Sequence, residues 1–410
     1  MRNSIFAISA VAILMAGCAA QSTVPPSVER KQFDVTGRSA SRDSVPANYV
    51  VLHEFHDSDG NLPNGDLIRD DAGNFYGATY VGGSKQVGVI FKMTATGNET
   101  VLHNFMYSDG ANPSGGLVRD ASGNLYGVAG YGGGQNDFGV VYKLDSAQIL
   151  TVLHAFTGSS GDGAFPIGRL VRTSDGRLFG ATEFGGNTAA CDGGCGTIFE
   201  IDASGKETVI FRFNGFEGYD VMDVIRDSAG DFYGTTSSGG DRSCTSGCGV
   251  AYKLKRDSSG VWHETVLHYF KGPEGDHPRA ALFRDGAGNL FGTTYSGGMS
   301  DLGVAFKIQP NGRLTVLHNF NGSDGENPRC NFVSDSAGNL YGSTYYGGDR
   351  SSGLIFKLDA SGGFALVYQF NGLTGGGPAG GLFRDNQGDL FGAADKYGAN
   401  GPGLVFELSH

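Results

Sequence analysis

Residues 100–144 read TVLHNFMYSDGANPSGGLVRDASGNLYGVAGYGGGQNDFGVVYKL, and edited copies of this stretch follow one another along the chain. Each copy contains an aromatic residue followed by glycine, directly after a turn. These pairs are Tyr76-Gly77, Tyr126-Gly127, Phe179-Gly180, Tyr233-Gly234, Phe291-Gly292, Tyr341-Gly342 and Phe391-Gly392. Successive pairs are 50, 53, 54, 58, 50 and 50 residues apart. A nearly fixed spacing in this range indicates an array of similar supersecondary units.

Each unit is predicted to contain four short strands. In the quoted copy these are residues 116–120, 125–129, 139–144 and 151–156. They are rich in β-branched and aromatic residues and are bounded by Gly, Asn, Asp and Pro, which is typical of strands joined by turns. No window after the first twenty residues has a helical apolar stripe. The pattern predicts an all-β fold, a seven-bladed β-propeller of four-stranded antiparallel blades, because radial repetition leaves only short, protected sheet edges.

The two ends of the repeat array complement each other. The array begins with a lone fourth strand at residues 50–55 and ends with a first-to-third set at residues 381–385, 389–394 and 403–408. Together these strands amount to one blade. We therefore expect the N-terminal strand to pair with the last blade and close the ring. A linear solenoid is disfavoured, because it would need polar end caps.

The start of the chain resembles an export signal. Residues 1–17 read as a secretory signal peptide, with Arg2 before an apolar run at 5–16 that is too short to span a bilayer. Residues 14–18 resemble the lipobox of bacterial lipoproteins, which implies that Cys18 is acylated; an ordinary cleaved signal peptide is the alternative. Residues 18–48 are polar and are interpreted as a disordered tether. Residues 49–410 are expected to form the propeller.

Composition narrows the range of partners. The 410 residues carry a formal net charge of −12, and the isoelectric point is about 5.1. This acidity argues against nucleic acid as a partner and against a surface that binds anionic lipid. We therefore expect membrane contact only through the lipid anchor, and no cofactor.

The repeats resemble a known family. The residues that carry the resemblance include 315–320, 339–344, Gly347-Gly348 and 355–358. Their order is similar to the GloVer tandem repeat of bacterial secreted and envelope proteins, and the match extends over residues 50–408. The resemblance implies a surface or secreted repeat protein with a sorting or anchoring segment, and it supplies no catalytic residues. The turn before each aromatic–Gly pair also resembles that of NHL propellers.

Four of the six cysteines form two closely spaced pairs. Cys191 and Cys195, and likewise Cys244 and Cys248, lie in the loops between strands two and three of successive units. In an exported protein this spacing predicts two local disulfides. Cross-pairing between the loops and a four-cysteine zinc site are the alternatives, although the spacing is not the usual one for zinc. Cys330 is interpreted as a small buried residue.

Recurrent polar residues are interpreted as structural. A histidine in Leu-His-x-Phe recurs as His53, His103, His154, His268 and His318, where we expect packing and hydrogen bonding. An arginine ends most first strands, at Arg69, Arg119, Arg172, Arg226, Arg284 and Arg384, and the aspartate that usually follows it is the expected ion-pair partner. Residues 57–66 faintly resemble a calcium loop but lack its distal Glu, so a turn is the preferred interpretation and no metal site is predicted.

Aromatic residues precede the Gly-Gly of the loops between strands two and three. They are Tyr80, Tyr131, Phe184, Tyr295, Tyr345 and Tyr346. We expect them on the face that carries the longer loops, where an exposed aromatic ring could bind a sugar or a peptide. Core packing at the blade ends is the alternative. His56, Glu183 and His277 lie in loops of the same face and break the symmetry, so they are the candidates if the protein is an enzyme.

Three functions remain open from the sequence. The first is an exported, lipid-anchored binding or scaffold module of the bacterial cell envelope, with a glycan or protein ligand; it would be secreted if Cys18 is not acylated. The second is a propeller enzyme of the lyase, lactonase or glycosidase type. The third is a purely structural envelope protein. No convergent catalytic set is visible, so the first is preferred over an enzyme.

Overall fold

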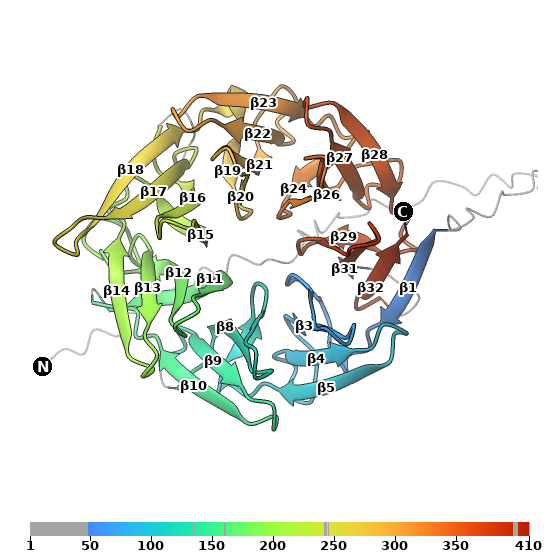
Figure 1. Cartoon of the computed structure of the whole chain (residues 1–410), viewed down its shortest axis with the longest axis horizontal. Helices are drawn as coiled ribbons and strands as arrows, with labels where there is room; N and C mark the ends of the chain where they lie inside the picture. The colour runs from blue at the N-terminus through green and yellow to red at the C-terminus, as the bar shows by residue number, and fades with distance from the viewer. Residues whose placement is uncertain are drawn as a thin grey trace, which may run out of the picture. The chain divides into compact units, whose positions relative to one another are not determined.

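The computed structural model describes residues 48–134, 136–159, 161–241, 244, 246–396 and 401–409. The predicted signal peptide, Cys18 and nearly all of the predicted tether lie outside the described residues. Apart from one short 3₁₀ helix, the regular secondary structure of the described residues consists of β-strands, arranged as seven antiparallel sheets around one axis (Figure 1). The prediction of a seven-bladed β-propeller is confirmed.

The first four blades follow one another along the chain. Blade 1 consists of β2 (Ile68–Arg69), β3 (Phe75–Thr79), β4 (Val89–Met93) and β5 (Glu99–Asn104). Blade 2 consists of β6 (Ala111–Pro113), β7 (Val118–Arg119), β8 (Leu125–Tyr131), β9 (Val140–Leu144) and β10 (Leu150–Ala155). Blade 3 consists of β11 (Gly163–Arg172), β12 (Leu178–Gly185), β13 (Thr197–Ile201) and β14 (Glu207–Arg212). Blade 4 consists of β15 (Tyr219–Arg226), β16 (Phe232–Ser238), β17 (Val250–Arg256) and β18 (Trp262–Tyr269).

The last three blades repeat the plan. Blade 5 follows the short 3₁₀ helix η1 (Gly272–Glu274) and consists of β19 (Asp276–Pro278), β20 (Phe283–Arg284), β21 (Leu290–Ser296), β22 (Val304–Ile308) and β23 (Leu314–Asn319). Blade 6 consists of β24 (Glu326–Pro328), β25 (Val333–Ser334), β26 (Leu340–Tyr346), β27 (Leu354–Leu358) and β28 (Phe364–Gln369). Blade 7 consists of β29 (Gly376–Pro378), β30 (Phe383–Arg384), β31 (Leu390–Lys396), β32 (Leu404–Leu408) and β1 (Tyr49–Glu54).

Blade 7 joins the two ends of the repeat array. Strand β1 pairs antiparallel with β32, from Tyr49 opposite Leu408 to Glu54 opposite Leu404. The Tyr49 ring also stacks on Tyr368 of blade 6, with centroids 4.4 Å apart. The predicted closure by the N-terminal strand is therefore confirmed. The closing strand is hydrogen-bonded within blade 7 and packs against blade 6.

The aromatic–Gly mark has a packing explanation. A Cβ atom on Gly77 would lie 2.6 Å from the tip of the Phe91 ring, which comes from the neighbouring strand β4. Gly292 stands in the same relation to Phe306. The glycine makes room for a fully buried aromatic ring in the middle of the blade. The repeated aromatic–Gly pair therefore lies at the centre of each blade's core.

The innermost strands differ from the prediction. In blade 2 the sequence predicts one strand at 116–120, but the structure has two short pieces, β6 and β7, that both pair with β8. The chain bends away from its partner between them, at small residues such as Gly115, where a Cβ atom would lie 2.2 Å from the carbonyl oxygen of Gly168. The backbones of neighbouring blades meet there around the axis, so an unbroken strand with side chains would not fit in this blade.

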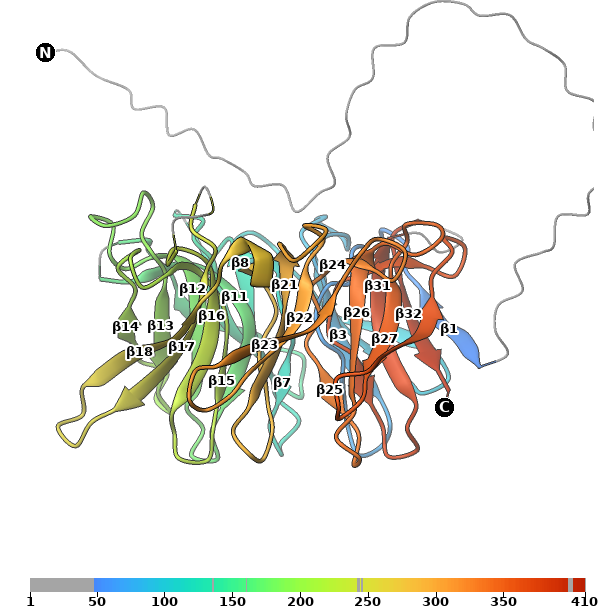
Figure 2. The same ribbon diagram turned by 90° about the horizontal axis from the view of Figure 1, so that it is seen from above.

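The two ends of the blades carry different loops (Figure 2). One end has the tight Asp-x-x-Gly turns between the first two strands, which we call the turn face. The other end has the loops between strands two and three and the loops between blades, which we call the loop face. No helix within the described residues is long and apolar enough to cross a membrane.

The recurrent histidines and arginines tie neighbouring parts together. Each histidine accompanies an acid of the following loop, at 2.8 to 3.3 Å, as in His268 with Glu274 and His53 with Asp59. The interpretation as packing and hydrogen-bonding residues is confirmed for His103, His154, His268 and His318, whose Nε2 atoms are hydrogen-bonded to these acids. His53 packs edge-on against Phe55 and lies at ion-pair distance from Asp59. The expected arginine partner was wrong. Arg69 pairs with Asp385 of the preceding blade at 3.3 Å, because the following aspartate is occupied in closing its own turn.

Candidate ligand site at the axis of the loop face

The inner segment of each blade has a residue with a positive φ at an equivalent position. These residues are Leu62, Asn112, Phe165, Asp220, His277, Asn327 and Gly377, with φ between 51° and 62°. This backbone conformation is uncommon for residues with side chains. It is held by bonds between blades: the N–H of His277 donates to Cys248 O at 3.1 Å, and that of Asn327 to Leu302 O at 2.9 Å. The repeated bend fixes where the neighbouring inner-strand side chains emerge.

Two arginines follow this bend in blades 5 and 6. The Arg279 guanidinium lies 4.8 Å from the Tyr295 ring centroid. The Arg329 guanidinium lies between two rings, 4.8 Å from Tyr295 and 4.4 Å from Tyr345. Cation–π contacts of this kind hold a guanidinium in place while leaving its N–H edge available. Neither arginine has a hydrogen bond or ion pair with any described residue, and the Nε atom of each is buried without a partner.

Two carboxylates from blades 3 and 4 face these cations. Burial raises the pKa of Glu183 to about 7; the Asp220 charge adds to this and Arg279 opposes it. Burial also raises the pKa of Asp220, against hydrogen bonds from Ser238 and Ser237. Glu183 and Arg279 belong to blades 3 and 5, so their interaction requires that both side chains turn toward the axis. We call Glu183, Asp220, Arg279, Tyr295, Arg329 and Tyr345 the axial cluster.

Blade 7 adds a buried carboxylate and a lysine to the edge of the axial cluster. The Tyr345 hydroxyl donates to Asp395 Oδ2 at 2.9 Å. Burial raises the pKa of Asp395 to about 6, although this hydrogen bond opposes the rise. The Lys396 Nζ lies 4.2 Å from the Tyr345 ring centroid and donates to the Tyr346 hydroxyl at 3.1 Å. Three successive blades therefore supply one cation each to the same side of the axis.

A second polar layer lies two residues further along the inner strands. Asp66 of blade 1 pairs with Arg169 of blade 3 at 3.7 Å and accepts hydrogen bonds from Asn331 of blade 6 and from the backbone of Gly381. Blades 1, 3 and 6 are not neighbours in the ring, so these contacts cross the axis. They hold the inner strands together beneath the axial cluster.

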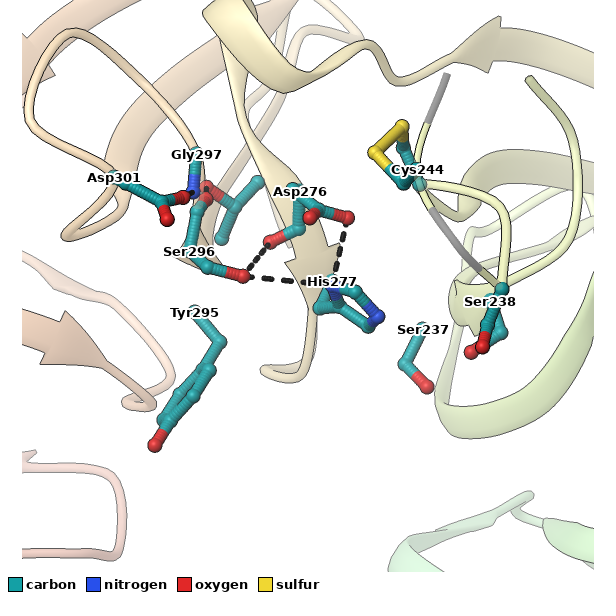
Figure 3. A network of polar contacts seen from close by, with 12 residues as sticks. Ser237, Ser238, Cys244, Asp276, His277, Tyr295, Ser296, Gly297 and Asp301 are labelled. Atoms are coloured by element: carbon teal, nitrogen blue, oxygen red, sulfur yellow. Dashed lines mark hydrogen bonds and ion pairs between the residues drawn. A yellow bond between two sulfur atoms is a disulfide. The ribbon is translucent and has the colours of Figure 1, made fainter. Parts of the chain in front are cut away.

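His277 stands beside the axial cluster (Figure 3). Its Nδ1 atom lies 2.7 Å from Asp276 Oδ1 and 3.4 Å from Ser296 Oγ, and its ring lies between Ser296 and the serines of β16. The Asp276 carboxylate therefore lies directly against one ring nitrogen. His277 also acts on Asp220, whose pKa it lowers among smaller effects.

The symmetry-breaking candidates from the sequence are only partly brought together. The Asp220 charge raises the pKa of Glu183, and His277 lowers the pKa of Asp220, so these two candidates both interact with Asp220. His56 instead lies 3.8 Å from Asp59, whose carboxylate also contacts His53 of the outermost strand. A catalytic set that combines His56 with the other two is therefore not assembled.

The predicted aromatic residues divide into two groups. Tyr295, Tyr345 and Tyr346 form the cation stacks of blades 5 to 7. Tyr131 and Phe184 both pack edge-on against Phe165, with centroids 5.2 Å and 5.9 Å from it, and the Tyr80 hydroxyl is within electrostatic reach of Tyr131 and Glu183. None of the six is exposed, and Tyr345 is only 4% exposed. Inner-strand residues and neighbouring cations cover much of the rings, which favours the alternative of packing at the blade ends.

The cysteines form the two local disulfides that were predicted. Cys191 bonds to Cys195, and Cys244 bonds to Cys248, with Cα atoms 5.2 Å apart in each pair. Cys330 is free and buried, as expected. The two stapled loops border an open cleft of about 640 Å³, lined by Phe184, Ala190, Cys191, Asp192, Asn214, Gly215, Phe216, Tyr219, Gly239, Gly240, Cys244, Ser246 and Gly247.

The sequence reasoning missed Arg279, Arg329 and Asp220. A signal was present. The position after the inner-strand proline is Asn64, Ser114, Ile167, Arg279, Arg329 or Ala379 in six of the units, and only two of these are charged. The aspartates of the suspected calcium loop, by contrast, serve the turn: Asp57 accepts from Asn61 at 2.8 Å and Asp59 from the backbone of His56 at 2.6 Å.

Solved structures share the fold at low sequence identity. Virginiamycin B lyase from Staphylococcus aureus superposes with a TM-score of 0.56 at 11% identity, over 88% of this chain and 98% of that one. The extracellular domain of a one-component system from B. thetaiotaomicron gives a TM-score of 0.56 at 11% identity over 88% of this chain, which spans 40% of that protein. Puromycin hydrolase gives 0.53 at 12% identity, over 82% and 51% of the two chains. Identities this low establish the shared propeller fold only.

Sequence comparison identifies the family. No protein of curated function matches the chain. The model of the Gloeobacter/Verrucomicrobia repeat matches residues 41–246 and 220–410, which together include nearly all of the described propeller. The chain is therefore a member of the Gloeobacter/Verrucomicrobia repeat family, built as a closed seven-bladed β-propeller.

Proposed function

We propose that this protein is a binding module of the bacterial cell envelope that recognises an acidic sugar at the axial cluster. The observation that carries the proposal is the pair Arg279 and Arg329. Both guanidiniums are positioned by tyrosine rings, and neither forms an ion pair with a carboxylate among the described residues. A fork of N–H donors that is held in place and has no ion-pair partner is suited to a ligand carboxylate.

The rest of the axial cluster fits the hydroxyl groups of such a ligand. Glu183 and Asp220 lie across from the arginines and can accept hydrogen bonds from sugar hydroxyls. Tyr295 offers partly covered aromatic surface beside the cations. A neutral sugar would use only the acceptors, and an inorganic anion only the arginines. An acidic sugar uses both halves, which is why we prefer it.

Calorimetry with monosaccharides tests this proposal. Galacturonate and glucuronate should bind, and galactose and glucose should bind at least tenfold more weakly. Arg329→Gln and Arg279→Gln should each weaken uronate binding by roughly 10- to 100-fold, the usual range for a hydrogen bond to a charged group. Arg313→Gln is the matched control, because Arg313 is an exposed arginine of the same propeller in a turn of blade 5. Equal binding of uronate by wild type and both variants would contradict the proposal.

A second candidate is an enzyme that uses His277 as a general base. The Asp276–His277 pair beside Asp220 and Glu183 is the observation that favours it, because an oriented imidazole among buried carboxylates can move a proton. An uronate-containing oligosaccharide incubated with the full chain would be the first substrate. Product formation that is lost in His277→Gln, with binding retained, would replace the binding module by an enzyme.

The location is proposed from the sequence. A lipid on Cys18 would hold the propeller at the envelope, and the two disulfides are compatible with an oxidising compartment. A mass spectrum of the mature N-terminus should show a diacylated or triacylated Cys18. A free N-terminus downstream would indicate secretion instead. A purely structural role would be favoured if no sugar binds and the propeller co-purifies with other envelope proteins independently of Arg279 and Arg329.

A further inference from the structure

The outer seams between neighbouring blades repeat one three-residue arrangement. It consists of a residue of strand four, a residue of the loop that follows (an acid at most seams), and a residue near the start of strand four in the next blade. Two ring stacks establish the third position: His318 lies 4.0 Å from Phe364 and Tyr368 lies 4.4 Å from Tyr49, between centroids. The register gives the equivalent residues of other blades as Glu99, Leu150, Glu207, Glu264 and Leu314.

Two seams combine a histidine, an aspartate and a glutamate. One contains His53, Asp59 and Glu99, and the other contains His154, Asp162 and Glu207. In each, one ligand-type atom per residue lies within 4.8 Å of the other two. The Oε1 atoms of Glu99 and Glu207 are buried and have no hydrogen-bond partner among the described residues. A buried polar atom without a partner is costly, and something must compensate for it.

We propose that each of these two seams binds one Zn²⁺ ion. One imidazole nitrogen and two carboxylate oxygens are ligands that zinc accepts, and a water would complete the tetrahedron. Zinc–ligand bonds of about 2.0 to 2.1 Å place tetrahedral ligands roughly 3.3 Å apart. The His53 Nε2 atom lies 3.3 Å from Asp59 Oδ2, and His154 Nε2 lies 3.2 Å from Asp162 Oδ1. The histidine and aspartate of each seam would therefore need little movement, and the glutamate carboxylate, which lies within 4.8 Å of them, would move closer.

The surroundings support an ion at these seams. Asp162 is fixed by backbone N–H groups of Thr157 and Gly163, at 2.8 and 2.7 Å, so its carboxylate is oriented before any ion arrives. The side chains of His154 and Asp162 are 21% and 11% exposed, which leaves a path from solvent.

The other seams explain why only two sites are expected. His103 with Asp109 and His318 with Asp324 keep the pair, but Leu150 and Phe364 replace the glutamate. The seam with Glu217 and Glu264 has Phe211 in place of the histidine. Each of these seams lacks one of the three ligands, so no zinc is expected there, and they serve as internal controls for the two complete seams.

Zinc titration of the full chain tests the proposal. After treatment with a chelator, native mass spectrometry and calorimetry with ZnCl₂ should show two ions per chain. Glu99→Leu and Glu207→Leu should each retain one ion, and the double variant none. These substitutions install the residue that a sister seam already carries, which favours folding. Glu274→Gln, at a seam without the third ligand, is the control and should keep two ions.

Thermal unfolding gives an independent readout. Zinc should raise the melting temperature of the wild type and leave that of the double variant unchanged, because an ion stabilises the state that binds it. His154→Phe, which copies Phe211, replaces Glu207→Leu if that variant does not fold. Two ions bound by the double variant, or none bound by the wild type at 100-fold excess of zinc, would overturn the proposal. Neither outcome depends on sugar binding.

Discussion

The turn face and the axial cluster occupy opposite ends of the same repeated strands, and they differ in what is repeated. At the turn face nearly every blade uses an aspartate in the same way: Asp120 accepts from the N–H groups of Ser122 and Asn124, and Asp335 from those of Ala337 and Asn339. Near the axial cluster, the residue three positions after the glycine of the aromatic–Gly pair differs between most blades. It is Tyr80, Gly130, Glu183, Ser237, Tyr295, Tyr345 or Asp395.

The difference shows which positions the fold constrains. A turn needs an acceptor for its own N–H groups, so the side chain is dictated by the backbone. Near the axis, bonds between backbones of neighbouring blades already satisfy the chain, and the side chains are free to vary. Residues that differ among equivalent positions are therefore where a ligand can be recognised.

Removal of β1 tests the repeated architecture and should have the largest effect. Deletion of residues up to Glu54 removes the pairing with β32 and the Tyr49 stack on Tyr368. We expect destabilisation by roughly 5 kcal/mol or more, since loss of one large buried aromatic alone costs about 3 to 5 kcal/mol. Chemical denaturation should report it against a chain that begins at Asn48. An unchanged midpoint would mean that the ring does not depend on its closing strand.

Glu264→Gln should stabilise the protein at alkaline pH. Burial, together with Glu217, raises the pKa of Glu264 to about 8 from an ordinary value of 4.5. The folded state therefore favours the proton, and the stability gained below pH 4.5 is lost as the pH rises through 8. The melting temperature of the variant should be about 2 to 5 °C higher than that of the wild type at pH 8, and the two melting temperatures should be nearly equal at pH 5. An equal difference at both pH values would rule out titration as the cause.

Asp335→Ala should separate the turn face from the axial cluster. Burial raises the pKa of Asp335, but hydrogen bonds from Asn339, Ala337 and Tyr341 outweigh it and hold the pKa below the ordinary value of 3.8. The variant should lose about 1 to 2 kcal/mol of stability at pH 7, measured by urea unfolding. This stabilisation is lost in the wild type as the pH falls through the folded pKa. Uronate binding should be unchanged, and a loss of binding would remove the distinction between the two ends.

Glu183→Gln should have the smallest effect, and only on binding. Because burial raises the pKa of Glu183 to about 7, this residue gains a negative charge near the proposed anion site as the pH rises from 6 to 8. Uronate affinity should fall over this range by about 1 kcal/mol, a typical value for like charges near a surface. Calorimetry at both pH values should show a flat profile in the variant. A steep profile there would assign the dependence to another group, such as His277.

Local patterns predicted the elements that depend on nearby residues. The spacing of the aromatic–Gly pairs gave the number of blades, the incomplete ends gave the closure, and the cysteine spacing gave both disulfides. The pairing of Arg69 with Asp385 was missed, because an aspartate directly follows the arginine in the sequence, whereas Asp385 comes close only in the folded ring. Which aromatic rings are covered was also missed, since some of the covering cations come from the next blade: Arg329 covers Tyr295, and Lys396 covers Tyr345.

The sequence by itself determined the repeat and its strand pattern, because these follow from hydrogen bonding and packing within about fifty residues. It also determined the joining of its two ends, because the incomplete units at residues 50–55 and 381–408 complement each other. Only the tertiary structure decided which side chains meet at the axis and at the seams. Glu183 and Arg279 are almost a hundred residues apart, and His154 and Glu207 belong to different blades. Such encounters depend on the curvature of the closed ring, and this curvature is a property of all seven sheets together.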